Sequence, residues 1–81
     1  RVPMLEMPNP VGETRTALMD RINFDVAAFE LRRETMRDVA RAEGVYLCEQ
    51  PRVPLEDGIH PTAEGYRIKA NRLADCIADL K

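Results

Sequence analysis

Apolar residues recur along this chain with two different spacings, and together they predict four elements. Residues 2–7, VPMLEM, form a short and mostly apolar run that predicts a strand. Residues 22–43 gather their apolar side chains on one stripe of a helical wheel and their charges opposite. The unbroken run VYLC at 45–48 predicts a strand covered on both faces, and residues 63–80 predict a final amphipathic helix.

The helix over 22–43 is expected to pack through its apolar stripe and to expose its charged face. The expected stripe comprises Phe24, Ala28, Leu31, Thr35, Val39 and Ala42. The opposite face holds Glu30, Arg33, Glu34, Arg37 and Arg41, which we expect to be a solvated surface with ion pairs between neighbouring turns. Asn23 or Asp25 can cap the start, and Gly44 is placed to end the helix in the left-handed conformation.

The final helix is preceded by Thr62, a good N-cap residue. Its expected buried stripe comprises Tyr66, Ala70, Leu73, Ile77 and Leu80. Two loops rich in proline follow the predicted strands, at 8–21 and at 49–61.

The order strand, helix, strand, helix predicts an α/β fold with right-handed parallel crossovers. Two strands make a marginal sheet, because a usual sheet has about four to six strands. Residues 1–81 are therefore expected to be the C-terminal βαβα part of a larger parallel α/β unit. The other strands would come from an N-terminal part or from a partner chain, and a small independent α/β fold is the alternative.

Charge and composition narrow the function classes. The net charge is −2, from 12 basic and 14 acidic side chains, which argues against nucleic acid as a main partner. No apolar run is long enough to span a membrane. The sequence contains no serine, so a serine nucleophile would have to come from outside these residues.

The stretch EDGIHPTAEGY, residues 56–66, holds the one histidine, His60, with Asp57 three residues before it. It follows the carboxyl end of a predicted strand, where open α/β sheets place their binding sites. A catalytic imidazole needs a carboxylate that fixes its tautomer and stabilises the imidazolium. Asp57 could serve His60 in this way, although Asp-Gly, Pro and Thr also compose an ordinary turn that begins a helix.

The two cysteines, Cys48 and Cys76, are too few for a disulfide framework. Cys48 is expected to be a buried residue at a strand end, and the alternative is a nucleophile paired with His60. Zinc binding by Asp57, His60 and Cys48 is disfavoured, because the chain offers no second ligand pair at metal spacing.

The sequence DGIHPTAEGYRIKANRLADCI resembles the last block of the SGNH, or GDSL-type, serine hydrolases. The preceding order of helix, AEGVYL strand and proline-bearing loop is similar too. This resemblance implies that His60 is the general base of a Ser-His-Asp triad and that Asp57 orients it. It also implies a flavodoxin-like three-layer α/β/α sandwich, hydrolysis or transfer of acyl groups, and no metal or organic cofactor.

The chain departs from that family by lacking the blocks that carry the serine and the oxyanion donors. A single oxyanion donor contributes roughly 10²–10³ in rate, so the 81 residues alone are expected to be inactive as an esterase. The expected partners are a serine-bearing N-terminal part or partner chain and a small acyl ester. The alternative is a non-catalytic structural or interaction subunit with a hydrolase-like fold.

Overall fold

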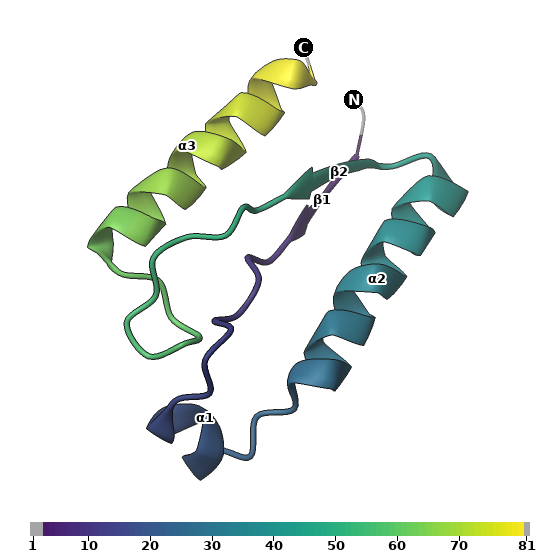
Figure 1. Ribbon diagram of the computed structural model, residues 1–81. Coiled ribbons are helices and arrows are strands. Elements are labelled where there is room, and N and C mark those ends of the chain that lie inside the picture. The colour runs from purple at the N-terminus through teal and green to yellow at the C-terminus, as the bar shows by residue number, and fades with distance from the viewer. Residues whose placement is uncertain (1–2, 81) are drawn as a thin grey trace.

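The computed structural model describes residues 3–80 of the chain (Figure 1). In chain order its elements are β1 (Met4–Met7), α1 (Ala17–Arg21), α2 (Val26–Glu43), β2 (Tyr46–Glu49) and α3 (Ala63–Asp79). The predicted alternation of strands and helices is confirmed, and α1 is an addition within the first loop. Among the helices of the described residues, none is both long and apolar enough to cross a membrane.

Within residues 3–80 the sheet consists of β1 and β2, which pair in parallel. The register places Met4 opposite Tyr46 and Met7 opposite Glu49. The parallel crossover through α2 brings the carboxyl ends of both strands to one edge of the sheet. The loops 8–16 and 50–62 both leave from this edge.

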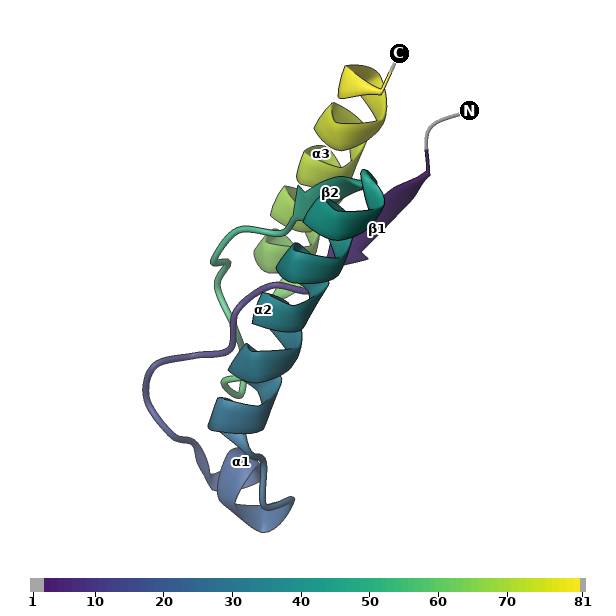
Figure 2. The ribbon, with the colours of Figure 1, turned by 90° about the vertical axis from the view of Figure 1, so that its right-hand side faces the viewer.

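The two long helices lie on opposite faces of the sheet. Alternate residues of a strand point to opposite faces. Cys48 of β2 is bonded to Cys76 of α3, whereas the next residue, Glu49, pairs with Arg37 of α2. Figures 1 and 2, which differ by a quarter turn, show the strands between α2 and α3. The chain is thus mixed α/β, with a helix against each face of a two-stranded parallel sheet.

Helix α2 begins four residues later than the sequence pattern indicates. Asp25 is its N-cap, and the Asp25 carboxylate accepts a hydrogen bond from the Ala28 N–H at 2.9 Å. The residues before it bond back to α1, as in the hydrogen bond from the Phe24 N–H to the Met19 carbonyl at 2.8 Å, and Asn23 there has a φ of 52°. Gly44 ends the helix at φ 69°, as predicted.

The buried face of α2 differs from the expected apolar stripe. Leu31 is 67% exposed and Val39 is 45% exposed, whereas Arg33, expected in solvent, is only 6% exposed. The Arg33 guanidinium donates from Nε to the carbonyl oxygen of Pro8 at 3.3 Å, which satisfies part of a buried charge. The predicted buried face of this helix was wrong, because the two strands cover only a narrow strip of the helix surface.

Helix α3 shows the same shift. Tyr66 and Ile77, both expected to be buried, are 55% and 44% exposed. The positions that pack are instead Gly65 and Cys76. The helix runs from Ala63 to Asp79 and follows its predicted N-cap, Thr62. Its bounds are therefore close to the prediction, whereas its buried face differs from the predicted one.

Candidate active site

The loop between β2 and α3 closes into a tight turn over residues 55–61, called the site turn below. Leu55 and Pro61 form an isolated antiparallel bridge, and the Glu56 N–H donates to the His60 carbonyl at 2.8 Å. Between them Gly58 adopts a φ of 90°, which other residues rarely adopt. A side chain at Gly58 would also lie 2.8 Å from the sulfur of Met19. The site turn therefore requires glycine at its centre.

The Asp57 carboxylate organises the site turn through three hydrogen bonds. Its Oδ1 accepts from the Ile59 N–H at 3.0 Å and from the His60 N–H at 2.7 Å. Its Oδ2 lies 2.7 Å from Nδ1 of the His60 ring. The His60 backbone N–H, the His60 ring and then the Ile59 N–H favour the charged carboxylate, and they lower the pKa of Asp57 from 3.8 to about 2.

The contact with Asp57 determines which ring nitrogen of His60 holds the proton. An ionised carboxylate can only accept hydrogen bonds, so Nδ1 is the donor in this pair. In the neutral ring Nε2 is then the free acceptor, which is the position a general base uses. The His60 side chain is 60% exposed and the Asp57 side chain is 29% exposed, so the ring is accessible from solvent.

The start of α3 holds the far end of the site turn. Thr62 accepts a hydrogen bond from the Gly65 N–H at 3.0 Å and donates its own N–H to the Pro54 carbonyl at 3.0 Å. A Cβ at Gly65 would lie 2.5 Å from that same Pro54 oxygen, so the loop can approach α3 only because position 65 has no side chain. The backbone on either side of His60 is thereby tied to the helix.

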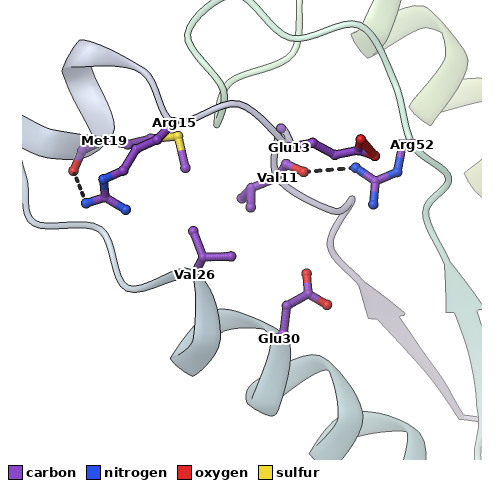
Figure 3. Close-up of a pocket in the computed structure, with 8 residues that line it drawn as sticks. Val11, Glu13, Arg15, Met19, Val26, Glu30 and Arg52 are labelled. Carbon is purple, nitrogen blue, oxygen red and sulfur yellow. Dashed lines mark hydrogen bonds between the residues drawn. The ribbon is translucent and has the colours of Figure 1, made fainter.

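A pocket of about 200 Å³ lies near the site turn but does not include the pair. Figure 3 shows Val11, Met19 and Val26 around its centre, with Arg52 at one side. Arg52 donates from Nη1 to the Val11 carbonyl at 3.1 Å. Neither Asp57 nor His60 lines this pocket. The hollow and the acid–base pair are therefore separate features of the same sheet edge.

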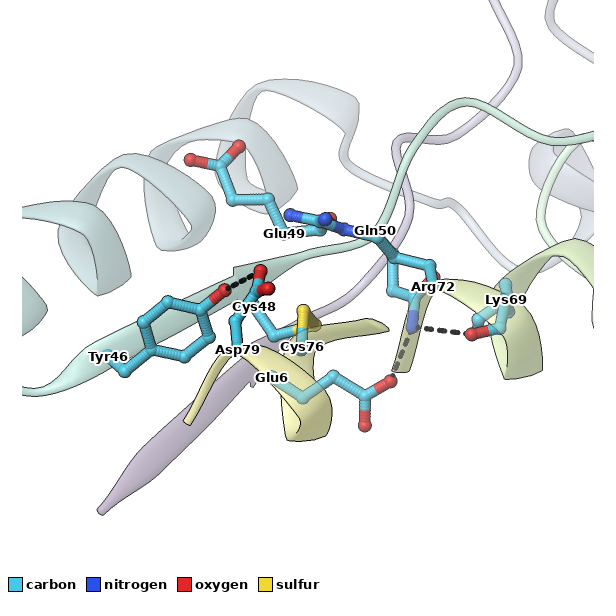
Figure 4. The surroundings of a disulfide bond; sticks show 9 residues. All are labelled: Glu6, Tyr46, Cys48, Glu49, Gln50, Lys69, Arg72, Cys76 and Asp79. Atoms are coloured by element: carbon cyan, nitrogen blue, oxygen red, sulfur yellow. Dashed lines mark hydrogen bonds between the residues drawn. A yellow bond between two sulfur atoms is a disulfide. The ribbon is translucent and has the colours of Figure 1, made fainter. Parts of the chain in front are cut away.

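The two cysteines form a disulfide that joins β2 to α3 (Figure 4). Both are fully buried, so the expectation of a buried Cys48 is confirmed. The alternative of a Cys48 nucleophile is wrong, because a sulfur in a disulfide has no thiolate to offer. The same bond removes Cys48 as a zinc ligand. Within residues 3–80 no group of three or more His, Cys, Asp or Glu side chains is placed to hold a metal ion.

Polar side chains surround the disulfide on the α3 face of the sheet. Gln50, which is 2% exposed, donates from Nε2 to Glu6 Oε2 at 2.7 Å and to the Lys69 carbonyl at 3.2 Å. The charged Glu6 within an apolar strand is thus explained by its contact with Gln50 across the sheet. It lies away from the site turn and takes no part in it.

Sequence reasoning identified Asp57 and His60, and the structure brings these two together. It did not predict that Thr16 and Met19 contact the site turn, or that Gly65 lets the loop approach α3. Gly65 carried a usable signal, since a glycine in the first turn of a helix is unfavourable unless something packs closely against it. The contacts of Thr16 and Met19 span about forty residues and leave no local pattern.

The chain was compared with models of known protein families, with curated proteins and with solved structures, and none of the three comparisons gave a match. The family resemblance described above therefore depends on the Asp-x-x-His motif and its order of elements.

Proposed function

We propose that this chain supplies the general base and its orienting carboxylate to a serine ester hydrolase of the SGNH type. The observation that carries the proposal is the 2.7 Å contact between Asp57 Oδ2 and His60 Nδ1 on an exposed ring. A turn that only began a helix would not need its carboxylate to bind the ring as well as two backbone N–H groups.

The proposed chemistry follows from the orientation of the pair. Nε2 of His60 takes the proton from a serine hydroxyl as that oxygen attacks the acyl carbon, and later returns it to the departing alcohol. Asp57 keeps Nδ1 protonated and stabilises the imidazolium formed between the two steps. The serine comes from another stretch of polypeptide, because this sequence contains no serine, and the proposal assigns the oxyanion donors to that stretch as well.

The proposed complete fold is a flavodoxin-like three-layer sandwich, of which this chain forms the C-terminal part. Support comes from the two helices on opposite faces of the parallel sheet, and from apolar side chains left in solvent. Leu31 and Val39 are called the open stripe of α2. Such a stripe is expected where further strands extend the sheet beneath the helix.

The test is ester hydrolysis by this chain together with its serine-bearing part, taken either from the sequence encoded directly upstream of Arg1 or from a partner chain. With a p-nitrophenyl ester, His60→Gln and Asp57→Asn should each lower kcat by about 10³- to 10⁴-fold. Glu56→Gln is the matched control, since Glu56 is an exposed carboxylate adjacent to Asp57. Activity that survives both substitutions would contradict the proposal.

A second candidate is a non-catalytic interaction subunit that uses the same fold. The open stripe of α2 favours it, because a partner that covered Leu31 and Val39 would remove both apolar side chains from water. This subunit would bind its partner through α2 and the sheet, and His60→Gln would leave that binding unchanged. The hydrolysis assay separates the two candidates, since only the first predicts that activity depends on His60.

A further inference from the structure

Two residues of the first loop donate hydrogen bonds to backbone carbonyl groups of the site turn. The Gly12 N–H donates to the Gly58 carbonyl at 2.8 Å, and the Thr16 hydroxyl donates to the Asp57 carbonyl. These two bonds hold the consecutive peptide groups on either side of Gly58. Both come from the segment that leaves β1, about forty residues away in sequence.

Both the hydroxyl group and the methyl group of the Thr16 side chain make contacts here. Its one hydroxyl proton goes to the Asp57 carbonyl, while its oxygen accepts from the Met19 N–H at 3.3 Å and so caps α1. Its methyl group lies 2.9 Å from the place where a side chain at Gly58 would begin. Thr16 therefore supports the centre of the site turn by a hydrogen bond and by direct packing.

We infer that Thr16 is a positioning residue for the Asp57–His60 pair. The Thr16 hydroxyl holds the peptide plane of the Asp57 carbonyl and the Gly58 N–H, and Gly12 holds the next plane, of the Gly58 carbonyl and the Ile59 N–H. Thr16 thus helps to set the direction in which the chain leaves Gly58 toward the backbone N–H groups of the next two residues. Those groups, from Ile59 and His60, are the ones that converge on Asp57 Oδ1. Oδ2 is then left facing the His60 ring. The catalytic part of this inference rests on the proposed function, and the geometric part does not.

A purely local role for Thr16 is the competing explanation, because Thr16 also caps a short helix. Three substitutions separate the roles. Thr16→Ser keeps both the cap and the donated proton. Thr16→Val keeps the shape and loses both, and Thr16→Asp keeps a good cap but has no proton to give when ionised. Asp25→Ala is the matched control, because it removes the cap of α2, a hydrogen bond from the Ala28 N–H, and keeps both hydrogen bonds from the first loop to the site turn.

The experiment reads the tautomer of the single histidine from its ring ¹⁵N shifts in the 81-residue chain near pH 8. We expect the wild type, Thr16→Ser and Asp25→Ala to hold the proton on Nδ1. Thr16→Val and Thr16→Asp should shift the population toward the Nε2–H form, as should Asp57→Asn. In the active assembly Thr16→Val should lower kcat by about 3- to 30-fold with little change in KM.

The outcomes distinguish this inference from the proposed function. If Asp57→Asn changes the tautomer and Thr16→Val and Thr16→Asp do not, the role of Thr16 is overturned and the proposed function stands. If Asp57→Asn itself has no effect on the ring, the pair is absent in solution and the proposed function fails first. A tautomer change in Asp25→Ala as large as that in Thr16→Val would overturn the inference as well, because general loss of stability would then explain both.

Discussion

The site turn and the open stripe of α2 are built in opposite ways. In the site turn, the Asp57 carboxylate has three hydrogen-bond partners, and the carbonyl groups of Asp57 and Gly58 are both held by the first loop. Along α2, large apolar side chains lie in solvent while an arginine is buried. The first region is completed within the described residues, whereas the second leaves Leu31 and Val39 in solvent, where the proposed assembly would cover them. Hydrogen bonds within residues 3–80 are therefore enough to form the acid–base pair, whatever covers the open stripe.

The largest effect on stability should come from the covalent bond that holds α3 to the sheet. Cys48 and Cys76 are 28 residues apart in sequence, and removing a bond across such a loop costs roughly 2–4 kcal/mol. The double substitution of both cysteines by alanine should lower the free energy of unfolding by that amount in urea titrations. Wild-type chain in dithiothreitol is the control and should approach the double variant. Equal stability with and without reductant would show that the bond between Cys48 and Cys76 does not stabilise the folded chain.

A smaller effect is expected where the loop approaches α3. Gly65→Ala forces the Pro54 carbonyl to move, because the new Cβ would begin 2.5 Å from it, and the cost should be about 1–3 kcal/mol. Gly44→Ala is the matched comparison: it costs only backbone strain, since no atom lies within 4 Å of its Cβ position. Amide shifts of Thr62 and His60 should change in the first variant alone. Equal shifts in both would mean that Gly65 has no special contact with the loop.

The open stripe should tolerate substitution in the isolated chain. Leu31→Gln should change the free energy of unfolding by less than about 0.5 kcal/mol, because an exposed side chain loses few contacts. In the proposed assembly the same change should weaken association or activity, and Arg32→Gln, at a neighbouring exposed position, should not. A large loss of stability in the isolated chain would show that Leu31 is buried there and that the stripe is not open.

The smallest effect concerns acid. The folded-state pKa of Asp57 lies below its ordinary value, so the stabilisation it contributes is present above pH 3.8 and is lost as pH falls through about 2. Between about pH 4 and pH 1, the amide signals of Ile59 and His60 should move toward those of Asp57→Asn with a midpoint near pH 2. The difference between wild type and Asp57→Asn isolates this group from other titrating carboxylates. Movement centred near pH 4 would indicate that the carboxylate is not held as described.

Sequence pattern was a good guide to local structure here. The two strands, the two long helices, the left-handed Gly44 and the cap at Thr62 all follow from short-range rules, which also gave Asp25 as one of two candidate caps for α2. Helix α1 was not predicted, because five residues within a loop of prolines and glycine are too few to show a helical spacing of apolar residues. Pairing of Asp57 with His60 was accessible for the same reason as the caps, since three residues separate them.

Contacts between segments far apart in the sequence could not be predicted from these short-range rules. Periodicity identified Leu31 and Val39 as apolar positions of α2, but which positions become buried depends on what lies opposite, and two strands cover little. The disulfide joins residues whose proximity arises only after β2 and α3 have packed. The support that Thr16 gives to Asp57 likewise depends on two loops meeting at one sheet edge.

The bond between Cys48 and Cys76 also turns part of the chain into a closed ring, and the site turn lies on that ring. A protease that cuts once within the exposed stretch around Pro51 and Arg52 would open the ring without releasing either piece. The two products would migrate as one species on a gel until a thiol is added.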